Sequence, residues 1–155
     1  MKSITIVRTL TTAALTALVL AIAPGAKAND RGCSEADLKG KFAYTSTGFI
    51  VADAPPALVG PLAEVGTIDF DGKGGVKFTF NSSTNGAVGP GSATGTYEVK
   101  DDCTGTFTET SDGFTAHFSF VLDKDGDEFQ AICQDPGVVV TRIGRRQCLR
   151  NDWRR

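Results

Sequence analysis

Several residue types that carry chemistry in small proteins are scarce in this chain of 155 residues, which has one histidine, one tryptophan and one methionine. A zinc site needs several histidine or cysteine ligands at short spacings, whereas the four cysteines are separated by 69, 29 and 14 residues. The GxSxG turn of many hydrolases and the lysine-bearing phosphate loop are also missing. The sequence therefore excludes these motifs, and we predict no cofactor.

Long apolar runs are absent after residue 28, so no membrane-spanning helix is predicted. Residues 1–28 have the pattern of a cleavable secretory signal. Lys2 and Arg8 give a positively charged start, and the stretch Thr9–Ala23 that follows is apolar or small. Ala26-Lys27-Ala28 forms a small-x-small cleavage site. We therefore predict an exported protein, secreted or periplasmic, whose mature chain begins near Asn29.

The four cysteines all lie in the predicted mature chain, at Cys33, Cys103, Cys133 and Cys148. An even number of cysteines in an exported protein is typical of disulfide bonds rather than of a metal site. Three pairing schemes exist, and the residues alone select none of them. We therefore expect one or two disulfides to cross-link the fold.

The clearest structural signal is the segment Gly66–Phe80. Ile68 and Phe70 alternate with polar residues before a glycine-rich turn, and Val76 and Phe78 do so after it. Side chains on a strand point to opposite faces with a period of two, so each arm buries one face and exposes the other. The segment is therefore predicted to be a β-hairpin, with glycines supplying the positive φ angles of a tight turn.

Similar alternation predicts further strands joined mostly by short turns. Their ranges are Lys41–Val51, Ala93–Lys100, Thr104–Thr110, Phe114–Leu122, Glu128–Cys133 and Val138–Ile143. Cys33–Gly40 is predicted as one helical turn, and Asp53–Pro61 and Asn81–Ser92 as loops. Hairpin-length links favour a meander that closes to remove its edges. We predict an all-β fold, a single antiparallel up-and-down β-barrel of about eight strands, lipocalin-like or calycin-like.

The predicted organisation is a signal peptide at 1–28, a barrel domain at 29–147 and an arginine-rich tail at 148–155. Removing residues 1–28 takes away three of the 16 basic residues and none of the 18 acidic ones, leaving a net charge of about −5. Arg142–Arg155 nevertheless holds six arginines and one acid. This stretch, with Trp153, could bind anionic lipid, lipopolysaccharide or nucleic acid, but we expect it to dock on acidic groups of its own barrel.

Short elements of the chain resemble those of small exported bacterial proteins of uncharacterised function, which are similar to closed barrels of the lipocalin or allene-oxide-cyclase type. The elements are Leu38-Lys39-Gly40, Phe70–Gly74, Gly95-Thr96-Tyr97 and Asp102–Gly105. The resemblance covers roughly residues 33–147 and implies the fold without an activity. In that family the cysteines that correspond to Cys33 and Cys103 recur, which implies a bridge between them and leaves Cys133 and Cys148 as a second pair.

Alternate links of an up-and-down barrel lie at opposite ends, so the links after the second, fourth and sixth strands share one end with both termini. That end is acidic, whereas the two predicted loops at the other end are almost uncharged. The same reasoning separates Cys133 from Cys148, because bridged Cα atoms lie within about 7 Å of each other. A Cys133–Cys148 bridge therefore conflicts with the predicted topology.

Two further features are interpreted as structural. Asp123–Glu128 begins like a calcium loop, but Glu128 and Gln134 stand where an EF-hand needs glycine and glutamate. We predict an acidic hairpin turn and no metal site. His117 alternates with the aromatic row of Phe114–Phe120, so its side chain is predicted to point outward, and we assign no catalytic residue.

An eight-stranded barrel is close to the size at which side chains either fill the interior or leave room for one small molecule. Close packing of protein interiors favours a filled core. Where space remains, the predicted ligand-binding residues are aromatic: Phe42, Tyr44, Phe78, Phe80, Tyr97, Phe118 and Phe120.

The leading functional hypothesis is non-catalytic binding of a small apolar ligand, through the barrel end that carries the proline- and glycine-rich loops. One alternative is a protein-interaction module with an exported partner, such as a hydrolase inhibitor or an envelope scaffold. The other is a cyclase- or isomerase-like enzyme, which would need ionisable groups that face the barrel interior beside a cavity. The predicted alternation offers few such groups.

Overall fold

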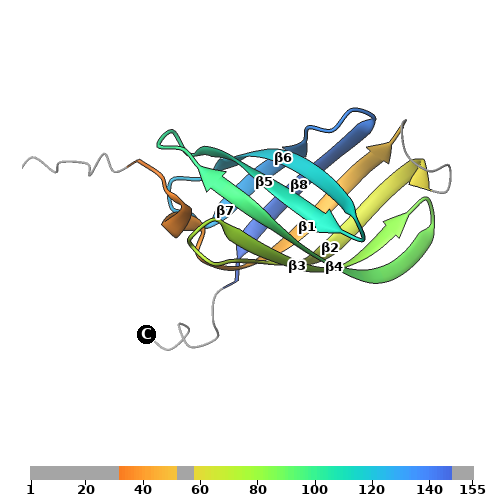
Figure 1. The fold of residues 1–155 in the computed structure, drawn as a ribbon, viewed down its shortest axis with the longest axis horizontal. Coiled ribbons are helices and arrows are strands. Elements are labelled where there is room, and N and C mark those ends of the chain that lie inside the picture. Colours follow the sequence, from red (N-terminus) through yellow and green to blue (C-terminus); the bar gives the residue numbers. More distant parts are fainter. Residues whose placement is uncertain (1–31, 52–57, 148–155) are drawn as a thin grey trace, which may run out of the picture. The chain divides into compact units, whose positions relative to one another are not determined.

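The structure is a computed structural model that describes residues 32–51 and 58–147. Within these ranges the predicted barrel is confirmed, because eight antiparallel strands pair in sequence order and the first also pairs with the last (Figure 1). They are β1 (Gly40–Ile50), β2 (Gly60–Phe70), β3 (Gly75–Thr84), β4 (Ala87–Val99), β5 (Thr104–Ser111), β6 (Phe114–Leu122), β7 (Glu128–Cys133) and β8 (Val138–Arg146). The predicted signal peptide and the tail at 148–155, with Cys148 and Trp153, lie outside the described residues.

Alternation of side chains along each strand separates the barrel interior from its outer wall. In β1, Phe42, Tyr44 and Ser46 are buried, while the residues between them are exposed. Two glycines allow neighbouring strands to approach closely where the sheet coils. A Cβ atom at Gly48 would lie 1.9 Å from the Val139 carbonyl oxygen, and the same overlap would arise at Gly95. Any larger residue at these two positions would force the strands apart.

The segment Asn81–Ser92, predicted as a loop, is instead a long hairpin, so that prediction was wrong. It contains the end of β3 and the beginning of β4, joined by Asn85 and Gly86. Both residues have positive φ angles, 48° and 87°, as a two-residue type I′ turn requires. Glycine, serine and threonine dominate the flanking positions, which hides the apolar alternation expected of a strand.

Two other strands are also longer than predicted. Strand β2 begins at Gly60, so its first two residues belong to the segment Asp53–Pro61 that is predicted as a loop. Glu64 is therefore a residue of this strand. Strand β8 continues to Arg146, three residues past its predicted end, so the first residues of the arginine-rich stretch belong to the barrel. The boundaries of β6 and β7 match their predictions residue for residue.

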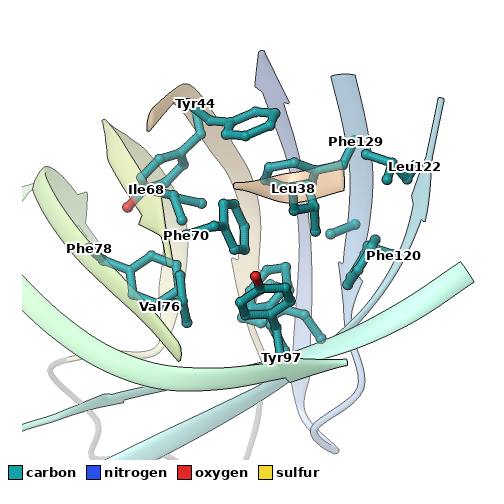
Figure 2. Packing of buried hydrophobic residues seen from close by; sticks show 14 of the residues in the cluster. Leu38, Tyr44, Ile68, Phe70, Val76, Phe78, Tyr97, Phe120, Leu122 and Phe129 are labelled. Carbon is teal, nitrogen blue, oxygen red and sulfur yellow. The ribbon is translucent and has the colours of Figure 1, made fainter. Parts of the chain in front are cut away.

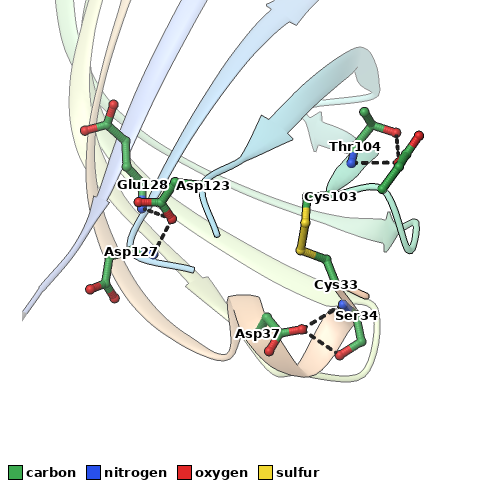
Figure 3. The surroundings of a disulfide bond; sticks show 9 residues. Cys33, Ser34, Asp37, Cys103, Thr104, Asp123, Asp127 and Glu128 are labelled. Atoms are coloured by element: carbon green, nitrogen blue, oxygen red, sulfur yellow. Dashed lines mark hydrogen bonds between the residues drawn. A yellow bond between two sulfur atoms is a disulfide. The ribbon is translucent and has the colours of Figure 1, made fainter. Parts of the chain in front are cut away.

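The end of the barrel that holds the links after β2, β4 and β6 is closed by a short 3-10 helix, η1 (Glu35–Leu38). Leu38 is fully buried among the inward-pointing side chains of the strands (Figure 2). The predicted Cys33–Cys103 disulfide is present and fixes the segment before η1 to the β4–β5 link (Figure 3). Asp37 accepts hydrogen bonds from the backbone N–H and hydroxyl of Ser34, at 2.7 and 2.9 Å.

Aromatic rings fill the interior beneath η1. Phe42, Phe70 and Phe129 pack edge-on or tilted, with ring centroids 5.4 to 6.0 Å apart. Phe107 packs 6.1 Å from Phe129 and continues the cluster toward the middle of the barrel. These closely packed rings form the filled core that the sequence predicted. The filled core occupies only the half of the interior beneath η1. Among the described residues, no helix is long and apolar enough to cross a membrane.

Candidate functional site

A cavity of about 620 Å³ occupies the half of the barrel that lies opposite the disulfide. Its walls are mostly apolar and come from every strand except β4, with residues of the β1–β2 and β7–β8 links. They include Ile50, Leu58, Leu62, Phe80, Phe114 and Val138. A volume of this size suits a small organic molecule, because ligand pockets commonly measure about 300–1,000 Å³.

The cavity arises because inward side chains become smaller along several strands. Along β1, the inward-facing residues are Phe42, Tyr44, Ser46 and Gly48, in order from the closed end toward the open end. Their side chains become smaller in that direction. Along β6, the inward residues shrink from Phe120 and Phe118 to Ala116. The alternation of each strand is preserved, so the barrel wall is continuous although the interior at this end is not filled by side chains.

A buried arginine forms the floor of the cavity. Arg142 of β8 is 3 % exposed, and its Nε donates a hydrogen bond to Ser46 Oγ at 2.7 Å. Its Nη2 donates to Glu64 Oε1 at 3.1 Å and lies 2.8 Å from Glu109 Oε2. The hydroxyl of Tyr44 donates to the same Glu64 oxygen at 2.5 Å. One cation therefore joins carboxylates from β2 and β5 inside the barrel.

Aromatic rings surround the Arg142 guanidinium group. Its central carbon lies 4.4 Å from the ring centroid of Tyr44 and 4.7 Å from that of Phe118. Phe78 and Phe107 follow at 5.5 and 5.7 Å. The Nη1 atom is buried and has no hydrogen-bond partner among the described residues. Cation–π attraction to these rings offsets part of the cost of burying this group.

Burial controls the ionisation of the groups around Arg142. Burial raises the pKa of the Glu64 carboxyl, and this effect outweighs the hydrogen bond from Tyr44 and the charge of Arg142, which both lower it. Burial also raises the pKa of the Tyr44 hydroxyl far above its ordinary value. Tyr44 therefore remains protonated and acts as the hydrogen-bond donor to Glu64.

The mouth of the cavity carries a second polar group, at Asp135. Its carboxylate accepts hydrogen bonds from the His117 backbone N–H at 2.9 Å and from the Cys133 thiol at 3.5 Å, and it contacts His117 Nδ1 at 2.8 Å. Burial raises the pKa of the Asp135 carboxyl, but these hydrogen bonds outweigh it and hold the pKa below its usual value. The His117 side chain is 58 % exposed, which confirms that it points outward.

This mouth cluster lacks the geometry of a cysteine–histidine nucleophile. Asp135 contacts both Cys133 and His117, so the carboxylate rather than the imidazole faces the thiol. Burial raises the pKa of the Cys133 thiol, and so does the adjacent charge of Asp135. A nucleophilic cysteine needs the opposite shift, because the thiolate is the reactive form. Cys133 has no disulfide partner among the described residues.

The acidic turn after β6 is a structural feature, as predicted. Asp123 Oδ1 accepts the backbone N–H groups of Asp127 and Glu128, at 2.8 and 3.1 Å, and strands rather than helices flank the turn. Across the described part of the chain, no three histidine, cysteine or acidic side chains are grouped to hold a metal ion.

The expected docking of Arg142–Arg155 on the acidic end is wrong for Arg142, which lies inside the barrel. Arg145 and Arg146 do contact acids of that end, with Nε atoms 2.6 Å from Glu128 and 2.9 Å from Asp127. Arg142 differs because it occupies an inward position of β8, two residues after buried Val140. Counting in twos along the strand would have revealed this orientation.

The predicted ligand-binding residues divide between the two halves. Phe80 and Phe118 line the cavity. Tyr44 and Phe78 lie next to Arg142 below it. The other three are packed in the aromatic interior: Phe42, Tyr97 and Phe120. Sequence reasoning missed the polar floor of Glu64, Glu109 and Arg142, although Glu109 stands two positions after inward-facing Phe107, as Arg142 does after Val140.

Comparison with known proteins identifies the architecture. No protein-family model matches the chain, and no curated protein matches it. A de novo designed fluorescence-activating β-barrel is 16% identical over 74% of this chain and 99% of its own, with a TM-score of 0.52. The structure of EF1p2_mFAP2b bound to DFHBI is 15% identical over 72% of this chain and 94% of its own, also with a TM-score of 0.52. At such identities these similarities show the closed barrel fold alone.

Proposed function

We propose that the protein is an exported, non-catalytic β-barrel that binds one small, largely apolar molecule in the cavity at its open end. The cavity itself carries this proposal, because about 620 Å³ of mostly apolar space is left open at one end of a barrel whose opposite half is closely packed. Burial of apolar ligand surface against the cavity walls would supply the binding free energy.

Two observations support export. The Cys33–Cys103 disulfide is typical of proteins that fold in an oxidising compartment. Residues 1–28 have the sequence pattern of a secretory signal, which would direct the chain to such a compartment.

The chemistry of the polar groups supports binding rather than catalysis. Glu64 and Glu109 are both held by the Nη2 atom of Arg142, which ties each carboxylate to a fixed counter-charge. The raised pKa of the Cys133 thiol argues against a thiolate nucleophile at the mouth. The two similar structures support the capacity of the fold to hold a small molecule, since one is a designed fluorescence-activating β-barrel and the other is EF1p2_mFAP2b bound to DFHBI.

A neutral, environment-sensitive dye such as N-phenyl-1-naphthylamine tests the proposal. We expect its fluorescence to rise with saturable, one-to-one binding to the purified mature protein. Ala116→Trp should abolish the signal, because Ala116 lines the cavity and an indole ring would occupy it. The matched control is Ala63→Trp on the outer wall of β2, which should bind the dye like the wild type. Equal binding by both variants would overturn the proposal.

A further inference from the structure

The charges that line the open-end cavity are unbalanced. Glu64, Glu109 and Asp135 all line it, and Arg142 is the one basic side chain among the described lining residues. The Arg142 charge is already shared by two carboxylates. The cavity therefore combines apolar walls with a surplus of negative charge.

Each floor carboxylate has an oxygen that the floor contacts leave free. Both Tyr44 and Arg142 donate to Oε1 of Glu64, which leaves its Oε2. Arg142 pairs with Oε2 of Glu109, which leaves its Oε1. Both glutamates line the cavity, so these two oxygens can accept hydrogen bonds from a molecule bound at the floor.

Arg142 is poorly placed to receive a ligand itself. Its Nη1 atom is enclosed, and the rings of Tyr44 and Phe118 lie against the guanidinium group. An anion at this floor would lie beside two carboxylates and one guanidinium, whose Nη2 atom is already paired with both carboxylates. Like charges in an apolar, poorly hydrated site repel more strongly than they do in water.

We infer that the cavity selects a hydrophobic molecule with a hydrogen-bond-donating, cationic head, of the class of protonated alkyl or aryl amines. The head lies at Glu64 and Glu109, and the apolar body extends along Leu62, Phe80 and Val138 toward the mouth. This inference rests on the proposed function, since it names the ligand class for the same cavity. It excludes fatty acids as the preferred ligands.

Three probes of equal chain length test the head group: n-octylammonium, 1-octanol and octanoate, each titrated calorimetrically into the mature protein at pH 7. We expect octylammonium to bind at least about tenfold more tightly than octanoate, with octanol between them. Equal affinities, or a tighter alcohol or carboxylate, would overturn the inference and leave the proposed function standing. If none of the three binds, the proposed function fails as well.

A pair of charge-neutralising variants locates the contact. Glu109→Gln should weaken octylammonium binding on the order of tenfold to a hundredfold, because it removes a charged acceptor, and should leave octanol within about twofold. Glu98→Gln is the matched control, since it changes the net charge equally from an exposed position on β4. Equal losses in the two variants would show long-range attraction instead of a contact and would overturn the inference. The wild-type series remains decisive if Glu109→Gln does not fold.

Discussion

The two halves of the barrel share one backbone pattern and have opposite interiors. Beneath η1, Phe42, Phe70 and Phe129 fill the space between the strands, and Leu38 covers them. Toward the other end, Ser46, Gly48 and Ala116 occupy equivalent inward positions and leave a cavity of about 620 Å³. Alternation thus determines which side chains point inward, whereas their size determines whether the interior is solid or open.

The polar groups differ between the halves in the same way. At the closed end, Arg145 and Arg146 form ion pairs near the surface, and Arg146 also donates to backbone carbonyls of η1 and the β6–β7 link. At the floor of the cavity, Arg142 forms its ion pairs away from water. Surface pairs contribute little to stability, whereas breaking a buried pair leaves an uncompensated charge. The comparison therefore predicts unequal effects for similar substitutions.

The largest effect is expected from a cavity created in the solid half. Phe129→Ala should lower the free energy of unfolding by about 3–5 kcal/mol, because Phe129 contacts several other rings and is 1 % exposed. Phe114→Ala, at the mouth and 63 % exposed, should change it by less than about 0.5 kcal/mol. Urea denaturation of both variants gives the comparison. Similar losses would show that the two halves are packed alike.

Removing the buried cation should have nearly as large an effect. Arg142→Met is expected to cost about 3–5 kcal/mol, because it leaves the carboxylates of Glu64 and Glu109 without their counter-charge. Arg145→Met removes an exposed pair with Glu128 and should cost less than about 1 kcal/mol. Thermal unfolding of the two variants at equal pH measures the difference. A mild Arg142→Met variant would contradict a buried ionic floor.

Opening the disulfide should destabilise the protein without affecting the cavity. Replacing both Cys33 and Cys103 with serine should cost about 2–4 kcal/mol, because the bond closes a loop with a sequence separation of 70 residues. Dye affinity at low temperature should remain unchanged, since the bond lies at the closed end. A parallel loss of dye affinity in the folded variant would show that the two ends are coupled.

The smallest effects concern pH and have opposite signs at the floor and the mouth. The pKa of Asp135 lies below its usual 3.8, so this group stabilises the fold above that pH and the contribution is lost as pH falls. The pKa of Glu64 lies above its usual 4.5, so its contribution is full below that pH and is lost as pH rises through the folded value.

Asp135→Asn should therefore reduce the fall in the free energy of unfolding at acid pH. Glu64→Gln should reduce the fall in the free energy of unfolding as pH rises above 4.5. Stability measured by urea denaturation from pH 3 to 7 tests both signs. The same slope change in both variants would contradict the assignment.

The closed barrel could be predicted from the sequence because apolar residues repeat with a period of two and the links are short. Strands β6 and β7 were clear since aromatic and aliphatic residues mark their inward faces. The end of β3 and the beginning of β4 could not be predicted, because glycine and serine occupy those faces and the residues around the Asn85-Gly86 turn have the composition of a loop. Small inward residues weaken the pattern at the positions where the cavity forms.

The floor of the cavity could be predicted only in part. The inward orientation of Glu109 and Arg142 follows from their spacing to Phe107 and Val140. Their meeting with Glu64 does not, because the three side chains come from β2, β5 and β8 and converge only when the sheet closes. Contacts across a barrel interior depend on strand stagger and closure, which local alternation leaves undetermined.

Methyl-group NMR with the neutral dye tests most directly whether one half of the barrel is open and the other solid. At saturation we predict shifts for the methyl groups of Leu62, Ala116 and Val138, which line the cavity, and none for those of Leu38 and Ile68 in the closed half. Shifts at Leu38 and Ile68, or confined to the outer-wall methyl groups of Val65, would contradict the account.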